Sequence, residues 1–224
     1  AQSATITTAG LHGRTLPLVR VTDQNALGDE SAKTWCATAW RHERVHGQFV
    51  VWSKDAAQQL RFNCSPLKNA SSKTLPASAV KTTFVRYVWA DGRAVGDVLD
   101  TRDRLDLPPN GYRPIWLTVT VPPKTSPGIY KGTLEVCAQG LEPLKFPLEL
   151  EVLAARLPKP RDWGFFLDLW QHPWAIARYH DVAPFSPAHY AFMEPIYREL
   201  ANAGQKTLTI SIGEQPWHHQ NFDP

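Results

Sequence analysis

A two-residue alternation of apolar and polar side chains, interrupted by proline and glycine, constrains this chain more than any other feature. Alternation over residues 114–121 places four side chains on one face of a strand: Ile115, Leu117, Val119 and Val121. Residues 146–152 repeat the pattern, and Ser126-Pro127-Gly128 between the two segments has the chemistry of a tight turn. The segment 114–138 therefore predicts a hairpin, and short strands with such turns predict a β-sandwich.

Further strands are expected at residues 16–21, 34–40, 44–53 and 80–89, and no helix is expected before residue 157. The 19 prolines favour loops and edge strands over long helices. Leu157-Pro158-Lys159-Pro160-Arg161 is typical of an extended connection between domains. The sequence thus predicts a β-sandwich domain over 1–157 and a second domain over 158–224.

The second part predicts one strand–helix–strand unit. Residues 163–170 form a near-continuous apolar run, which is typical of a strand buried on both faces of a parallel sheet. Ser186 and Gly204 mark the two ends of a helix, and residues 207–212 alternate as a second strand. The predicted fold class is mainly β: an N-terminal β-sandwich followed by the first βαβ unit of an incomplete (β/α)8 barrel. Two strands cannot cover their own faces, so we expect the barrel to continue beyond Pro224.

Composition excludes several classes of function. The chain carries 24 basic and 21 acidic residues with no basic run, so no nucleic-acid partner is expected. No run of about 18 apolar residues is present, so no membrane span is expected. Three cysteines allow at most one internal disulfide. The nine tryptophans fit either core packing or platforms on which sugar rings stack.

Candidate binding residues follow the two predicted barrel strands, because barrel sites lie at the carboxyl ends of strands. Asp168 and Trp170 follow the first, and Trp217, His218 and Gln220 follow the second. Asp168 is either a catalytic carboxylate or a residue hydrogen-bonded at the end of the sheet. The second group either contacts a polyhydroxylated ligand or forms an ordinary polar loop.

Neither a metal ion nor a cofactor is expected. His218 and His219 are adjacent, and neighbouring side chains of an extended segment point in opposite directions. His42 and His46 are interpreted as a surface pair. Asp168 and Glu214 do not make a convincing pair of glycosidase carboxylates, and neither a serine-nucleophile motif nor a phosphate loop occurs.

Six stretches, taken in order, resemble glycoside hydrolase family 123, including its related bacterial members. They are residues 40–48, 116–122, 127–132, 166–171, 200–206 and 216–220, which include Trp-Arg-His-Glu-Arg-Val-His-Gly-Gln, Pro-Gly-Ile-Tyr-Lys-Gly and Pro-Trp-His-His-Gln. The resemblance implies a β-sandwich packed on a (β/α)8 barrel. It also implies a retaining β-N-acetylgalactosaminidase that uses the acetamido oxygen of its substrate as the nucleophile.

In that family an adjacent Asp-Glu pair on a later barrel strand orients the acetamido group and supplies the general acid and base. The only adjacent Asp-Glu here is Asp29-Glu30, in the predicted sandwich, and it does not take that role. We therefore expect no catalytic residue in these 224 residues, and a chain that alone cannot hydrolyse a glycoside.

The expected partners are a glycan with a β-linked amino sugar and the remainder of the barrel, which a separate chain could supply. The resemblance implies a secreted or periplasmic protein that could be attached to the cell surface, and the absence of an initiator Met fits processing. Two alternatives stay open: a non-catalytic carbohydrate-binding or cell-surface interaction protein, and a barrel enzyme of another reaction class.

Overall fold

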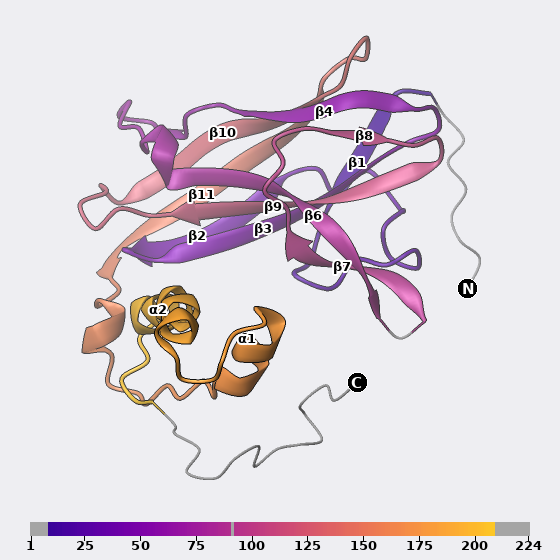
Figure 1. Cartoon of the computed structure of the whole chain (residues 1–224). Helices are drawn as coiled ribbons and strands as arrows, with labels where there is room; N and C mark the ends of the chain where they lie inside the picture. The colour runs from indigo at the N-terminus through magenta and orange to yellow at the C-terminus, as the bar shows by residue number, and fades with distance from the viewer. Residues whose placement is uncertain (1–8, 91, 209–224) are drawn as a thin grey trace. The chain divides into compact units, whose positions relative to one another are not determined.

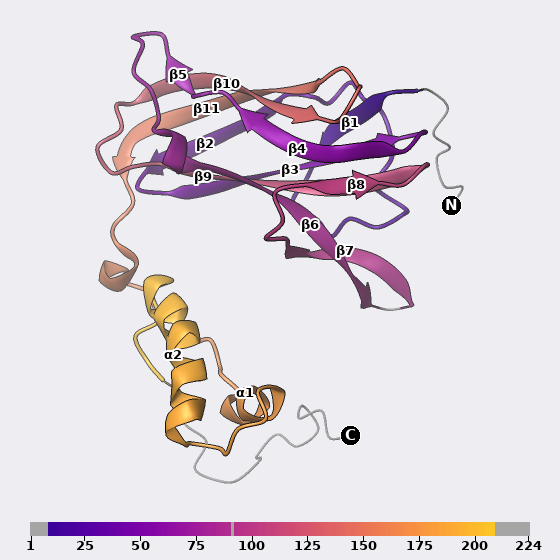
Figure 2. The same ribbon diagram turned by 45° about the horizontal axis from the view of Figure 1, so that its top comes forward.

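The computed structural model describes residues 9–90 and 92–208. The chain divides into two compact units, Ala1–Leu157 and Pro158–Pro224, and each is described by itself. The first unit is a sandwich of two β-sheets, whose layers can be followed in Figures 1 and 2. The regular elements in the described part of the second unit are helices.

The first sheet has five antiparallel strands in the order β1-β3-β9-β6-β7. The strands are β1 (Leu11–Leu16), β3 (Arg44–Ser53), β9 (Gly111–Thr120), β6 (Val80–Ala90) and β7 (Arg93–Leu99). The ends of β6 and β7 extend beyond the rest of this sheet as a twisted two-stranded ribbon (Figures 1 and 2).

The second sheet has the order β2-β11-β10-β4-β8, and the short strand β5 also pairs with β10. Its strands are β2 (Trp35–Arg41), β11 (Leu144–Arg156), β10 (Gly128–Cys137), β4 (Ala57–Cys64), β8 (Leu105–Leu107) and β5 (Lys68–Asn69). Strands β2 and β11 are parallel, and the other pairs are antiparallel.

The core lies between the two sheets and is built from the alternating positions of the sequence. One continuous apolar cluster fills the space between the inner faces of the two sheets. It includes Ile115, Leu117 and Val119 of β9 and Phe146 with its apolar neighbours on β11. Phe49 and Phe146 pack with their ring centroids 4.9 Å apart. This arrangement confirms the mainly β class. It also confirms that the apolar faces predicted for residues 114–121 and 146–152 point into the core.

Most of the predicted strands are present, and the strand at 44–53 has the predicted bounds. The strand predicted at residues 16–21 is displaced towards the N-terminus, because β1 spans Leu11–Leu16. The predicted hairpin at 114–138 is wrong, because β9 and β10 belong to different sheets. The loop between them passes from one sheet to the other. All three cysteines are free thiols, so no disulfide closes the fold.

The helical unit contains the 3-10 turn η2 (Pro160–Asp162), α1 (Pro173–Tyr179) and α2 (Pro187–Asn202). Ser186 caps α2 by accepting a hydrogen bond from the backbone N–H of His189, and Gly204 follows the helix with φ +104°. Ser186 thus acts as the predicted cap and Gly204 supplies the predicted left-handed stop. Helix α1 was not predicted.

The predicted strand at 163–170 is wrong, because these residues form no strand and pair with no neighbour in a sheet. Its large side chains are exposed, with Phe166 70% and Trp170 68% accessible. A doubly buried strand needs a sheet partner and covered faces, and the described residues of this unit supply neither. Thr207 and Leu208 are likewise outside any strand, and residues 209–212 lie outside the described residues. The first βαβ unit of a barrel is therefore absent from the described part of the chain.

Candidate functional site

The segment before α1 carries two of the predicted ligand-binding residues. Asp168 is half-buried, whereas the indole of Trp170 is largely exposed. An exposed indole and a carboxyl group two residues apart in the chain suit contact with a polyhydroxylated ligand. The two side chains are near each other in sequence, and both remain candidates.

The side-chain amide of Gln205 holds the segment before α1 through hydrogen bonds to its backbone. Its Oε1 accepts from the N–H of Leu169 at 3.2 Å, and its Nε2 donates to the carbonyl oxygens of Leu169 at 3.3 Å and Thr207 at 2.8 Å. A side chain thereby joins the two stretches that were predicted to be neighbouring strands. Gln205 was not singled out from the sequence, because an isolated glutamine after a helix has no distinguishing pattern.

The three remaining predicted binding residues, Trp217, His218 and Gln220, lie outside the described residues. Their assignment stays a prediction. Within residues 9–90 and 92–208, no group of three His, Cys, Asp or Glu side chains is arranged to hold a metal ion. None of the helices in this part of the chain is both long and apolar enough to cross a bilayer.

His42 and His46, interpreted as a surface pair, are both half-buried, and each contacts different groups of the sandwich domain. His42 has a left-handed backbone, with φ 70°, and its Nδ1 lies 3.1 Å from the carbonyl oxygen of Leu157. His46 lies on β3, and the Nε1–H of Trp116 donates to its Nδ1 at 3.1 Å. The Thr118 hydroxyl is also 3.2 Å from this atom.

These contacts fix the protonation of His46. An indole N–H only donates, so Nδ1 of His46 is an acceptor and the ring proton is on Nε2. Burial, reinforced by the nearby Arg44 charge, lowers the pKa of His46. The imidazole is therefore neutral at pH 7, with one N–H donor left for other groups.

A groove opens beside His46 on the outer face of the first sheet, opposite the core. Its volume is about 440 Å³, and its walls come from the loop after β1 and from β3, β6, β7 and β9, including Leu18, Val19, His46, Gln48, Leu99 and Trp116. We refer to it as the sheet-face groove. Sequence analysis did not find it, although two of the stretches that carry the family resemblance contain three of these residues.

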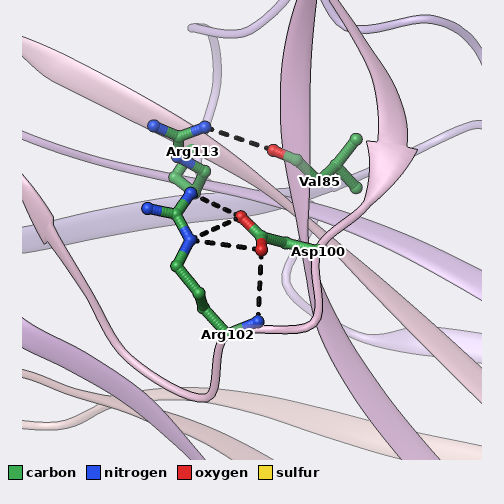
Figure 3. A network of polar contacts seen from close by, with 4 residues as sticks. All are labelled: Val85, Asp100, Arg102 and Arg113. Carbon is green, nitrogen blue, oxygen red and sulfur yellow. Dashed lines mark hydrogen bonds and ion pairs between the residues drawn. The ribbon is translucent and has the colours of Figure 1, made fainter.

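Near the groove, Asp100 anchors the loop that leaves β7 (Figure 3). Its carboxylate is buried and accepts from the backbone N–H of Arg102 at 3.1 Å and from the Nε of Arg102 at 2.9 Å. Arg113 beside it donates to the carbonyl oxygen of Val85 at 3.2 Å. The hydrogen bonds from Arg102 outweigh burial and lower the pKa of Asp100 to about 2.

This ion pair gives a prediction for acid stability. A carboxyl whose pKa is lowered in the folded state stabilises the fold above its ordinary pKa, 3.8, and this stabilisation is lost as the pH falls towards 2. Arg102 is half exposed and screened by water, so we expect a loss of about 1 kcal/mol between pH 5 and pH 2. Asp100→Asn should remove that part of the pH dependence, whereas Asp103→Asn, at a 90% exposed side chain, should keep it. Urea unfolding at pH 5 and pH 2 measures the change in the free energy of unfolding for each variant. If that change were the same for Asp100→Asn and wild type, the assignment would be contradicted.

Asp29 and Glu30, the only adjacent Asp-Glu pair, are engaged within the sandwich domain. Asp29 accepts from the backbone and the hydroxyl of Ser31, at 2.9 and 2.6 Å. Glu30 contacts His12 at 2.8 Å and Lys33 at 3.2 Å. Burial raises the pKa of Glu30, but its contacts with Lys33 and His12 outweigh that effect and lower it. Both carboxylates thus have the arrangement of local loop anchors.

Comparison with protein families gives two matches in chain order. The model of the glycoside hydrolase 123 N-terminal domain matches residues 22–138, and that of the glycoside hydrolase 123 catalytic domain matches residues 170–224. No curated protein matches the chain.

Among solved structures, the chain is similar to a family 123 glycoside hydrolase from Clostridium perfringens, described in terms of glycolipid glycan hydrolysis. The TM-score is 0.85 at 22% identity, over 96% of this chain and 40% of that one. The chain thus spans well under half the length of that structure. A PapD-like domain of human CEP192 (12% identity, 70% of this chain and 94% of that one, TM-score 0.37) and the sporulation control protein Spo0M from Bacillus subtilis (11% identity, 78% and 56%, TM-score 0.34) are too distant to carry an argument.

The N-terminal family model covers more than half of the chain, and the catalytic-domain model follows it in the expected order. The clostridial structure shares the fold over nearly all of this chain. The protein belongs to the glycoside hydrolase 123 family.

Proposed function

We propose that the protein is part of a retaining glycoside hydrolase that removes β-linked N-acetylgalactosamine by substrate-assisted catalysis. The observation that carries this proposal is the pair of family matches, N-terminal domain and then catalytic domain, in one chain. The printed description of the clostridial relative, glycolipid glycan hydrolysis, supports a glycan as the substrate. The specific sugar and the mechanism come from the family resemblance.

In this proposal residues 158–224 begin a (β/α)8 catalytic domain. Its sugar pocket includes Asp168, Trp170, Trp217, His218 and Gln220. The acetamido oxygen of the substrate attacks the anomeric carbon as the glycosidic C–O bond breaks, with an Asp orienting the acetamido group and a Glu protonating the leaving oxygen. The same Glu then takes a proton from the water that opens the cyclic intermediate and restores the acetamido group. Asp29 and Glu30 are held by Ser31, Lys33 and His12, so the catalytic pair is proposed to lie outside these 224 residues. Secretion or export to the periplasm is part of the same proposal.

The test is hydrolysis of aryl glycosides by the full-length protein. We expect chromophore release from an aryl β-N-acetylgalactosaminide, slower release from the glucosamine analogue, and none from the β-galactoside, which lacks the acetamido nucleophile. Replacing the acetyl by mono-, di- and trifluoroacetyl groups should lower kcat/KM stepwise, because fluorine withdraws electron density from the attacking oxygen. Turnover of the plain galactoside, or a flat fluorine series, would overturn the mechanism. No turnover of any of these glycosides would overturn the hydrolase proposal itself.

A further inference from the structure

Three polar features of the sheet-face groove have no role in the proposed hydrolysis. They are the Nε2–H of His46, the Oε1 of Gln48 and the paired charges of Arg20 and Asp97 at the rim. All three belong to the sandwich domain, and the family matches give no role to any of these residues.

His46 presents a donor of fixed identity. Its Nδ1 is occupied by the indole N–H of Trp116, so the ring proton is on Nε2, and among the described residues no hydrogen bond reaches that atom. This N–H is not among the buried polar atoms that lack a partner, so it is open to water, and the oxygen acceptor of a ligand can take the place of that water.

Gln48 presents an acceptor of fixed identity. Its side chain is nearly buried, and both hydrogens of its Nε2 are donated, to the carbonyl oxygens of Pro17 at 3.0 Å and Val19 at 2.8 Å. Carbonyl oxygens only accept, so the amide cannot be flipped and its Oε1 is left as an acceptor. Within the described part of the chain this oxygen has no hydrogen bond either.

The remaining walls are apolar and the rim is neutral. Leu18, Val19 and Leu99 are about half exposed, which is unusual for three large apolar side chains around one depression. Arg20 and Asp97 pair at 3.3 Å and cancel each other's charge. A fixed donor, a fixed acceptor and an apolar wall with no net charge match a ring that has both hydroxyl groups and C–H faces.

We propose that the sheet-face groove binds a neutral pyranose sugar, with His46 and Gln48 hydrogen-bonding its hydroxyl groups and the apolar wall packing on its C–H face. The volume of about 440 Å³ is within the range of small-molecule sites. This site uses none of the residues proposed for the catalytic pocket and does not depend on the hydrolase activity. It gives the sandwich domain a role in holding a glycan.

The indole N–H of Trp116 reports directly on the groove, because it is bonded to His46. Its signal in the 1H–15N spectrum of the purified protein is assigned by its loss in Trp116→Phe. Titration with N-acetylgalactosamine, galactose and glucose should shift it saturably, with a Kd in the millimolar range for at least one sugar. Glucuronic acid and glucosamine, which are charged, should bind more weakly.

Two variants test the site, and one serves as a control. His46→Ala removes the donor and should weaken binding about tenfold. Val19→Lys places a long charged side chain in the groove from an exposed position and should abolish binding without disturbing the core. Trp89→Ala, at a 77% exposed indole on β6 in the same sheet, should leave Kd unchanged.

Three outcomes would overturn the proposal. The Trp116 signal could stay unmoved by every neutral sugar at 100 times the expected Kd, or the shift could persist in Val19→Lys. A change of molar mass in Val19→Lys by light scattering, together with no sugar-induced shift, would instead identify the groove as a contact between copies of the chain.

Discussion

Replacing Phe146 by alanine is expected to lower the free energy of unfolding of the sandwich domain by about 3–5 kcal/mol. The ring is fully buried on β11 and packs against Phe49 of the opposite sheet. It is also close to the backbone of β1, since a Cβ added at Gly13 would meet the ring at 2.9 Å and the Val50 carbonyl at 2.6 Å. Strands from both sheets enclose this side chain, so they have little freedom to collapse into the cavity.

Phe166→Ala is the matched control, because it removes the same atoms from a side chain that is 70% exposed. We expect it to change stability by less than about 0.5 kcal/mol. The two units could unfold separately, so hydrogen exchange followed by mass spectrometry is the suitable measurement. Phe146→Ala should accelerate exchange in β9, β10 and β11. Equal effects of the two variants would contradict the sandwich core.

The sandwich strands could be predicted because their side chains obey one rule over a long distance. Residues 114–121 and 146–152 alternate, and each alternation buries one face against the other sheet. Strands that carry weaker patterns were missed. Leu60 is one of two fully or nearly buried residues in the polar strand β4, and β7 is interrupted by Gly96. Local pattern also does not tell which sheet a strand joins, which is why the hairpin at 114–138 was wrong.

The second unit was harder because its signals depend on neighbours. The apolar run at 163–170 predicts burial, yet burial requires a surface to cover it, and here the backbone of Leu169 is met by the side-chain amides of Gln171 and Gln205. Helix α1 was missed because it spans seven residues and its cap is His172, whose Nδ1 accepts from the backbone N–H of Ala175 at 3.2 Å. Histidine is not among the preferred N-cap residues.

The candidate site was predictable only in part, and for a related reason. Asp168 and Trp170 followed from the rule that barrel sites lie at strand ends, and the structure leaves that assignment a prediction. The sheet-face groove depends on side chains that meet across strands far apart in sequence, as His46 and Trp116 do. Spacing along the chain does not reveal that one ring nitrogen of a neutral histidine accepts a hydrogen bond from a distant indole.

The largest expected effect in the helical unit is that of His189→Phe. The imidazole of His189 is fully buried, and both ring nitrogens bind the backbone. Its Nδ1 accepts from the N–H of Phe185 at 2.7 Å, and its Nε2 donates to the carbonyl oxygen of Pro173 at 2.9 Å. One side chain of α2 thereby ties down the start of α1 and the loop between the two helices.

Phenylalanine fills similar space but bonds with neither group. The N–H of Phe185 would lose its partner, at about 1–3 kcal/mol if it stays buried, and the carbonyl of Pro173 would lose its bond to α2 while keeping the one within α1. We expect α1 to lose its attachment to α2 and the loop at 180–186 to open. Limited proteolysis should then cut this loop at least tenfold faster, and the amide of Phe185 should lose its protection from exchange.

His180→Phe is the matched control for this change. His180 is exposed and stacks on Phe192, with ring centroids 3.7 Å apart and planes inclined by 4°, and phenylalanine can keep that stacking. We expect its proteolysis rate to equal that of wild type. His189→Gln, which retains one donor and one acceptor, should recover part of the protection, because the cause of the loss is the unpaired backbone groups. If His189→Phe were as resistant as His180→Phe, the two hydrogen bonds would not be what holds α1 to α2.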